Sequence, residues 1–374
     1  MSDSCNCEAC VGTLLQLPRI RALHNPEICT CTHDVPVEAC WTQLRTLPVQ
    51  RCASPPIVEL LNKMGEHAEA STSLCSTETR DVASLAGLPH LRTRNICFKS
   101  MQDSVLCLLD KCAFLDMLDL SAPIYLTDIS PLAGVLTLEE LNMHNCSHVG
   151  RGAGDLGEMP RLRVLNLNTL VSDYCLVVLG ESLSFVKLYL SSCRHVSDIT
   201  PVLGTATLCE LNVLCRKNSR STKHNFPCLP NLRSLSIGCV DSSKYERHIL
   251  KHPQGLTSLK LRRDDSRAVK SSFTERMQTL VELERDANKM YVNLDRLFEL
   301  PHLRVLSLRC PGPSANVKFL PKFASMVKLS LTPHRKPTDL RPLANVESME
   351  ELHFNCFKLP RKGVIGSPPL LRHL

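Results

Sequence analysis

An apolar pattern that recurs every 22 to 24 residues is the feature that most constrains how this chain can fold. In the segment TLEELNMHNC (137–146), Leu138, Leu141 and Met143 hold the first, fourth and sixth positions of an L-x-x-L-x-L core. A fixed period of this length is typical of a repeat architecture. Taking the first apolar residue of each core as its anchor, the anchors are Ile20, Leu44, Ala68, Leu91, Leu115, Leu138, Leu162, Phe185, Leu208, Leu232, Leu256, Leu280, Leu303, Met326, Met349 and Leu371.

The residues that follow each anchor predict a short strand in every unit. Three residues after the anchor, fourteen of sixteen positions are Leu, and Ser71 and Arg94 are the exceptions. Five residues after it, twelve of fifteen are apolar, with Asn25, Ser73 and Arg285 as exceptions. Apolar and polar residues alternate here, which is strand periodicity. One short strand cannot bury its apolar side alone, so we expect the units to stack into a parallel sheet.

The segments between strands have a pattern of their own. The sequence TDISPL (127–132) recurs as SDITPV (197–202) and as TDLRPL (338–343). Asp before an apolar residue, with Pro soon after, predicts a capped turn that enters a short helical return. Proline also precedes several anchors by two residues, where a fixed φ and a missing N–H suit the entry to a strand; these are Pro18, Pro89, Pro160, Pro230 and Pro301.

An L-x-x-L-x-L core that closes on Asn or Cys is typical of leucine-rich repeats. We therefore predict an α/β solenoid: a leucine-rich repeat horseshoe with a parallel concave sheet, short helical or 3₁₀ returns and about 15 repeats. The D-I-S/T-P-L return before an L-x-x-L-x-L-x-x-C core (127–146) resembles the leucine-rich repeat proteins of trypanosomatid protozoa. That group includes expression-site-associated proteins described as adenylate cyclase regulators.

The pattern predicts two segments along the chain. Residues 1–16 form a Cys-rich N-terminal cap, and residues 17–374 form the solenoid. Irregular repeats are expected near 63–79 and 262–290, where polar residues fall on inward positions. The last core, from Leu371, ends in the middle of a repeat, which suggests a fragment or a truncated reading frame.

Composition limits the compartment and the partners. The 20 cysteines, in a chain whose start lacks a signal sequence, indicate free thiols in a reducing compartment, so we expect a cytoplasmic or nuclear protein. No run of 18 apolar residues predicts a membrane span. The net charge of +7 and 4% aromatic residues do not favour nucleic acid as the partner.

Strand residues two, four and six positions after each anchor should face outward on the concave side, where repeat proteins of this kind bind. We predict that a protein partner binds there. An asparagine row with one tyrosine offers hydrogen bonds and an aromatic anchor, and an acidic group follows further along the chain. A simple hydrated sheet face is the alternative. The candidate binding residues are Asn142, His144, Asn166, Asn168, Lys187, Tyr189, Asn212, Glu282 and Glu284.

Three other patterns are weaker functional candidates. Gly152, Gly154 and Gly157 match the dinucleotide fingerprint, but they lie inside a repeat, which favours a turn between strands. Cysteines seven or eight residues after an anchor, such as Cys146, are expected to be buried structural thiols. The N-terminal group could bind zinc, but its spacing does not match a known site, so no metal is predicted; it consists of Cys5, Cys7, Cys10, Cys29, Cys31 and His33.

No nucleophile elbow, phosphate-binding loop or metalloprotease motif is present, so neither an enzyme nor a cofactor is expected. The predicted function is a protein-recognition scaffold or adaptor whose partner is unknown. One alternative is a substrate receptor of an SCF-type ubiquitin ligase. Another is binding of nucleic acid or acidic lipid along a basic edge formed by Arg216, Lys217, Arg220, Arg263, Arg267, Arg335, Lys336, Lys358, Arg361 and Lys362.

Overall fold

The chain forms two compact units, Met1–Phe185 and Val186–Leu374, which are described separately. A computed structural model describes residues 73–76, 95–98, 102–107, 109–111, 115–121, 125–144, 146, 148–167, 171–193, 196, 198–215, 230–238, 255–264, 277–287, 297, 300–310, 325–333, 345–354, 370 and 372.

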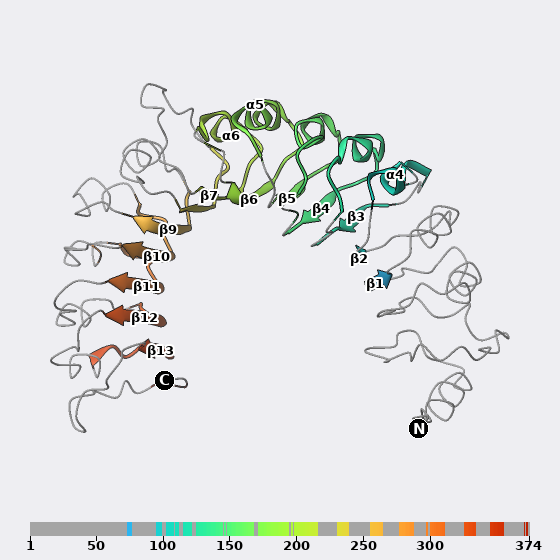
Figure 1. Ribbon diagram of the computed structural model, residues 1–374. Helices are drawn as coiled ribbons and strands as arrows, with labels where there is room; N and C mark the ends of the chain where they lie inside the picture. Colours follow the sequence, from blue (N-terminus) through green and yellow to red (C-terminus); the bar gives the residue numbers. More distant parts are fainter. Residues whose placement is uncertain are drawn as a thin grey trace, which may run out of the picture. The chain divides into compact units, whose positions relative to one another are not determined.

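The first unit contains parallel strands joined by short helical returns (Figure 1). Strands β1 (Ser73–Ser76) and β2 (Asn95–Phe98) pair with each other. Strands β3 (Met117–Asp119), β4 (Glu140–Met143) and β5 (Val164–Leu167) pair in chain order. The returns are α4 (Asp103–Leu106), η2 (Leu109–Lys111), η3 (Ser130–Gly134), η4 (Asp155–Glu158) and α5 (Asp173–Glu181).

The second unit continues the same pattern. Its helical return α6 spans Thr200–Leu203. Its strands pair in parallel, each with its neighbours in the chain. They are β6 (Lys187–Cys193), β7 (Glu210–Cys215), β8 (Ser234–Gly238), β9 (Ser258–Asp264), β10 (Glu282–Ala287), β11 (Val305–Cys310), β12 (Lys328–Pro333) and β13 (Glu351–Phe354).

The buried residues are those that the repeat pattern predicts. In β4, the anchor Leu138 and the inward residues Leu141 and Met143 are all buried, and the same three positions are buried from β3 to β9. Parallel pairing brings equivalent residues of successive repeats opposite one another, so the core forms continuous apolar rows. Strand β10 departs from the rule, since Arg285 takes the inward position and is only 2% exposed.

The prediction of short helical or 3₁₀ returns is confirmed. Asp128 Oδ1 accepts hydrogen bonds from the Ser130 backbone N–H and hydroxyl, at 2.9 and 2.7 Å, directly before η3. In the next unit, Asp198 Oδ1 accepts from Thr200 N at 2.9 Å before α6. The aspartate thus fixes the turn by bonding the backbone two residues ahead, and the proline that follows starts the helix. The third copy of this motif, at 338–343, lies outside the described residues.

A hydroxyl just before the anchor ties each of several repeats to the one before it. Thr137 Oγ1 donates to the carbonyl oxygen of Leu115, the preceding anchor, at 2.8 Å. Equivalent bonds join Thr279 to Leu256, Ser325 to Leu303 and Ser348 to Met326, at 2.7, 3.2 and 2.7 Å. These bonds satisfy carbonyl groups beside the core, where an unpaired acceptor would be costly.

One part of the predicted register is wrong. The anchors Ala68 and Leu91 would place Thr72 opposite Asn95, but the structure pairs Ser73 with Asn95. Leu74 consequently lies opposite Ile96. A register is fixed by its apolar residues, and the polar sequence AEASTS (68–73) gives no apolar pattern to follow until Leu74.

The repeat around Leu280 is continuous where the structure describes it. Strand β10 pairs with β11 over residues 282–286 and with β9 over the same residues. Its register against β9 shifts between Asp286 and Ala287, where Ala287 lies opposite Asp264.

The three glycines of the G-x-G-x-x-G match lie between β4 and β5, as expected for a turn between strands. Gly152 has a φ of +86°, and a Cβ atom there would lie 2.1 Å from Ser130 N. A Cβ on Gly157 would lie 2.8 Å from the Val178 carbonyl oxygen. These two glycines therefore allow neighbouring returns to approach closely. This packing role explains why glycine stands at both positions, and no nucleotide-binding role is needed.

Candidate recognition face

We use the term open face for the strand side chains that alternate with the buried core residues, at positions two, four and six after each anchor. All the candidate binding residues occupy such positions. Asn168 lies outside the described residues. In the first unit the described open face consists of Met117, Asp119, Ser121, Glu140, Asn142, His144, Val164 and Asn166.

Asn142 is the centre of the open face in the first unit. It lies opposite Asp119 on β3 and opposite Asn166 on β5. Its Nδ2 donates to Asp119 Oδ2 at 3.0 Å and approaches Ser121 Oγ at 3.4 Å. Its Oδ1 is buried and meets no donor in the described part of the chain. The asparagine row that the sequence predicted is therefore present here as a pair, Asn142 and Asn166.

In the second unit, Tyr189 lies opposite Asn212, and Asn212 lies opposite Ser236 on β8. Asn212 Oδ1 and Ser236 Oγ are both buried, and neither has a hydrogen-bond partner among the described residues. Beside this row, Lys187 Nζ lies 3.8 Å from Glu210 Oε2. Unpaired buried polar atoms are uncommon and require an explanation; here, two of them lie side by side next to a tyrosine.

The predicted acidic group is largely neutralised by its neighbours. Glu282 lies 2.9 Å from Lys260 Nζ and accepts a hydrogen bond from Ser258 Oγ at 2.7 Å. Asp286 lies 3.4 Å from Arg309 on β11. Burial raises the pKa of Glu282, but the bonds from Ser258 and Lys260 outweigh it and hold the pKa below its usual value. The open face therefore carries ion pairs in this region, and not a free acidic surface.

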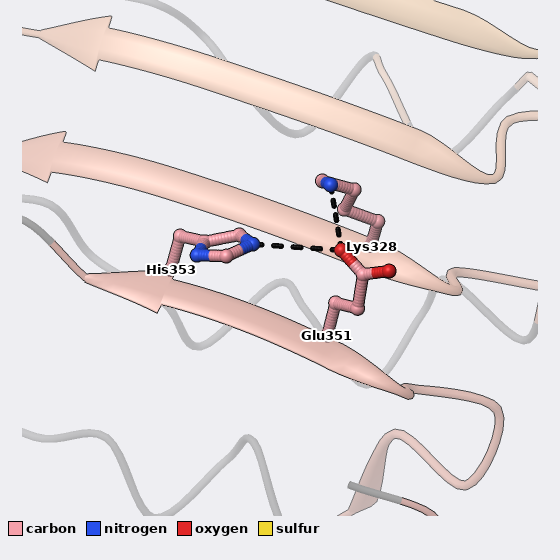
Figure 2. Close-up of polar contacts among 3 residues, drawn as sticks. All are labelled: Lys328, Glu351 and His353. Carbon is pink, nitrogen blue, oxygen red and sulfur yellow. Dashed lines mark hydrogen bonds and ion pairs between the residues drawn. The ribbon is translucent and has the colours of Figure 1, made fainter. Parts of the chain in front are cut away.

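Another cross-strand cluster was not among the candidates from sequence. Lys328 Nζ on β12 lies 2.6 Å from Glu351 Oε2 on β13, and His353 Nε2 lies 3.5 Å from the same oxygen (Figure 2). Lys328 and Glu351 stand two residues after their anchors, Met326 and Met349. Opposite charges at equivalent positions of adjacent repeats are therefore the sequence signal that predicts such a pair.

Cys146 follows the prediction of a structural thiol. It is buried, and its Sγ donates to the Leu120 carbonyl oxygen of the preceding repeat at 3.1 Å.

The N-terminal Cys and His residues lie outside the described part of the chain, as do the side chains of the predicted basic edge. The described residues contain no group of three His, Cys, Asp or Glu side chains that could hold a metal ion. They also contain no helix that is both long and apolar enough to cross a membrane.

Solved structures with similar folds belong to the leucine-rich repeat class. An internalin, InlF from Listeria monocytogenes, matches 83% of this chain and 87% of its own with a TM-score of 0.59 and 19% identity. A leucine-rich repeat protein of Leptospira interrogans matches 85% of this chain and 83% of its own, with a TM-score of 0.51 and 16% identity. A TLR13–ssRNA13 complex matches 84% of this chain and 54% of that chain, with a TM-score of 0.50 and 14% identity. The chain therefore has the leucine-rich repeat fold.

Among curated proteins, part of the chain resembles a Trypanosoma equiperdum protein named "Putative adenylate cyclase regulatory protein". The two are 29% identical over 161 residues, which are 42% of this chain and 25% of that protein. The match therefore spans about a quarter of the relative. No protein-family model matches the chain. The match to the Trypanosoma equiperdum protein confirms the resemblance to trypanosomatid leucine-rich repeat proteins that the motifs predicted.

Proposed function

We propose that this chain is a non-enzymatic recognition module that binds a protein partner on the open face of its sheet. The observation that supports this most is the pair Tyr189 and Asn212, presented side by side by β6 and β7 with an unpaired amide oxygen. A tyrosine supplies contact area at low entropic cost, and an asparagine beside it supplies adaptable hydrogen bonding.

The architecture agrees with this function. A parallel sheet places one side chain of each repeat beside the equivalent side chain of the next, so a long partner can contact many repeats at once. The named regulatory role of the trypanosomal relative supports the same class, because regulators commonly act by binding another protein. A cyclase is therefore one partner worth testing, although the matched segment is only 25% of that relative.

The test compares two variants for capture of partners from a lysate of the source organism. The face variant combines Lys187→Ala, Tyr189→Ala and Asn212→Ala. The control, Tyr174→Ala, removes another tyrosine, which is 76% exposed on the return helix α5. Bound proteins are quantified by mass spectrometry, and circular dichroism verifies that both variants fold.

We expect at least one protein to bind the wild type and the Tyr174→Ala control but not the face variant. Its direct binding to purified chain should then weaken by about tenfold or more, since central aromatic contacts dominate interface energies. Equal capture by the wild type and the face variant, with loss in the control, would instead place recognition on the return side and contradict the proposal.

A further inference from the structure

The part of the open face on strands β3 and β4 lies in a stretch that has no positively charged side chain other than histidine. Residues 112–150 contain five acidic residues and neither Lys nor Arg, although the whole chain has a net charge of +7. Asp128 belongs to the turn before η3. The other four, at or beside strands β3 and β4, are Asp116, Asp119, Glu139 and Glu140.

The open face carries two of these carboxylates, Asp119 and Glu140. The charge of Glu140 is the less well balanced by its neighbours. It lies opposite Met117 on β3 and opposite Val164 on β5, so an aliphatic side chain flanks it on either side. No described residue forms an ion pair or a hydrogen bond with its side chain. All three side chains are partly exposed and can be reached from solvent.

Three other polar side chains of this face, Asp119, Ser121 and Asn142, are bonded to one another. Asp119 already accepts hydrogen bonds from Ser121 N at 2.9 Å and from Asn142 Nδ2 at 3.0 Å. Asn142 thereby uses its amide N–H on Asp119 and keeps an unpaired Oδ1. The carboxylate of Glu140 and the Oδ1 atom of Asn142 therefore remain as acceptors without a described donor. Lys and Arg side chains are donors only, so they complement such a surface.

Glutamates at the equivalent position in the second unit each have a lysine nearby, whereas Glu140 has none among the described residues. Glu210, Glu282 and Glu351 also stand two residues after an anchor. Each of them lies within 3.8 Å of a lysine on a neighbouring strand. At Glu140 the neighbouring strands supply Met117 and Val164 instead. Among the described residues, no such cation therefore lies on the strands beside Glu140.

We propose that the open face of β3, β4 and β5 binds a segment of a partner protein that presents Lys or Arg side chains. Glu140 receives the ammonium or guanidinium group, and Met117 and Val164 contact the aliphatic stem, as long basic side chains prefer. This inference rests on the proposed function and specifies the chemistry of the partner at the first unit. It also predicts association that is faster at low salt.

The test uses the full chain and a phage library of random short peptides. Enriched peptides are synthesised, and their affinities are measured by isothermal titration calorimetry against wild type, Glu140→Gln and Glu351→Gln. The last variant is the matched control, because it removes a carboxylate from the same repeat position on β13. Glu140 has no described partner, so its substitution should leave the thermal unfolding temperature unchanged.

We expect Lys and Arg to be enriched in the selected peptides, with binding weakened about tenfold or more by Glu140→Gln and hardly changed by Glu351→Gln. Peptides without basic residues, or basic peptides that bind Glu140→Gln as well as wild type, would overturn the inference. If such peptides depend on Lys187 or Tyr189, the proposed function stands alone. If they depend on no open-face residue, both proposals fail.

Discussion

Gly152 approaches the backbone of Ser130 so closely that a Cβ atom on it would lie 2.1 Å from Ser130 N. Its φ of +86° is also one that L-residues with side chains rarely adopt. Gly150, two residues earlier, has no atom within 4 Å of a Cβ built on it. Gly152 therefore cannot carry a side chain without strain, whereas Gly150 has room for one, although both belong to the same turn.

We therefore expect Gly152→Ala to lower the free energy of unfolding by at least about 2 kcal/mol, because it adds both backbone strain and a steric clash. Gly150→Ala should change it by less than about 0.5 kcal/mol. Urea denaturation followed by circular dichroism measures both. Equal stability of the two variants would show that the close approach of the turns is not required.

The thiol of Cys146 should be protected by the fold. It is buried and donates to the Leu120 carbonyl oxygen, whereas Cys107 is exposed. In a brief iodoacetamide pulse followed by peptide mass spectrometry, we expect Cys107 to be alkylated and Cys146 to react only after denaturant is added. Rapid labelling of Cys146 in the native protein would contradict a structural role. Cys146→Ala should cost about 1–2 kcal/mol of stability.

Much of the fold follows from periodicity alone, because the stacking of strands requires the same apolar positions in every repeat. Leu118, Leu141 and Leu165, three residues after their anchors, are buried as the pattern predicts. The pattern fails at Ala68, where polar residues give the register no apolar guide and the strand shifts by one residue.

The candidate site was harder to predict because periodicity places a residue on the open face without showing its neighbours' charges. The acidic residues Glu282 and Asp286 are an example. From sequence they form an acidic group, but pairing with β9 and β11 gives each a cation. Conversely, the isolation of Glu140 becomes visible only when Met117 and Val164 are known to be its neighbours.

Arg285 shows that an inward position can also hold a charged residue. It lies opposite Leu261 and Leu308 and is 2% exposed, whereas the side chain of Arg309 on the next strand is 69% exposed. Arg285→Ala should therefore lower the free energy of unfolding by about 2–4 kcal/mol through a cavity and lost polar contacts. Arg309→Ala should change it by less than about 1 kcal/mol, because its ion pair with Asp286 is exposed. Chemical denaturation of both variants checks this order.

The cluster of Lys328, Glu351 and His353 makes stability depend on pH in a predictable direction. The hydrogen bond from Lys328, together with a weaker one from His353, lowers the pKa of Glu351. A carboxylate whose pKa is lower in the folded than in the unfolded state, where it is about 4.3, stabilises the fold above that value. This contribution is lost as the pH falls through the folded-state pKa.

We therefore expect Glu351→Gln to be slightly less stable than wild type at neutral pH and to match it in acid, below about pH 3. Lys328→Met should move the pKa of Glu351 back toward its ordinary value, because it removes the strongest bond to the carboxylate. Carbon-13 NMR titration of the Glu351 carboxyl measures that pKa directly. An unchanged pKa in Lys328→Met would show that the 2.6 Å contact between Lys328 Nζ and Glu351 Oε2 does not persist in solution.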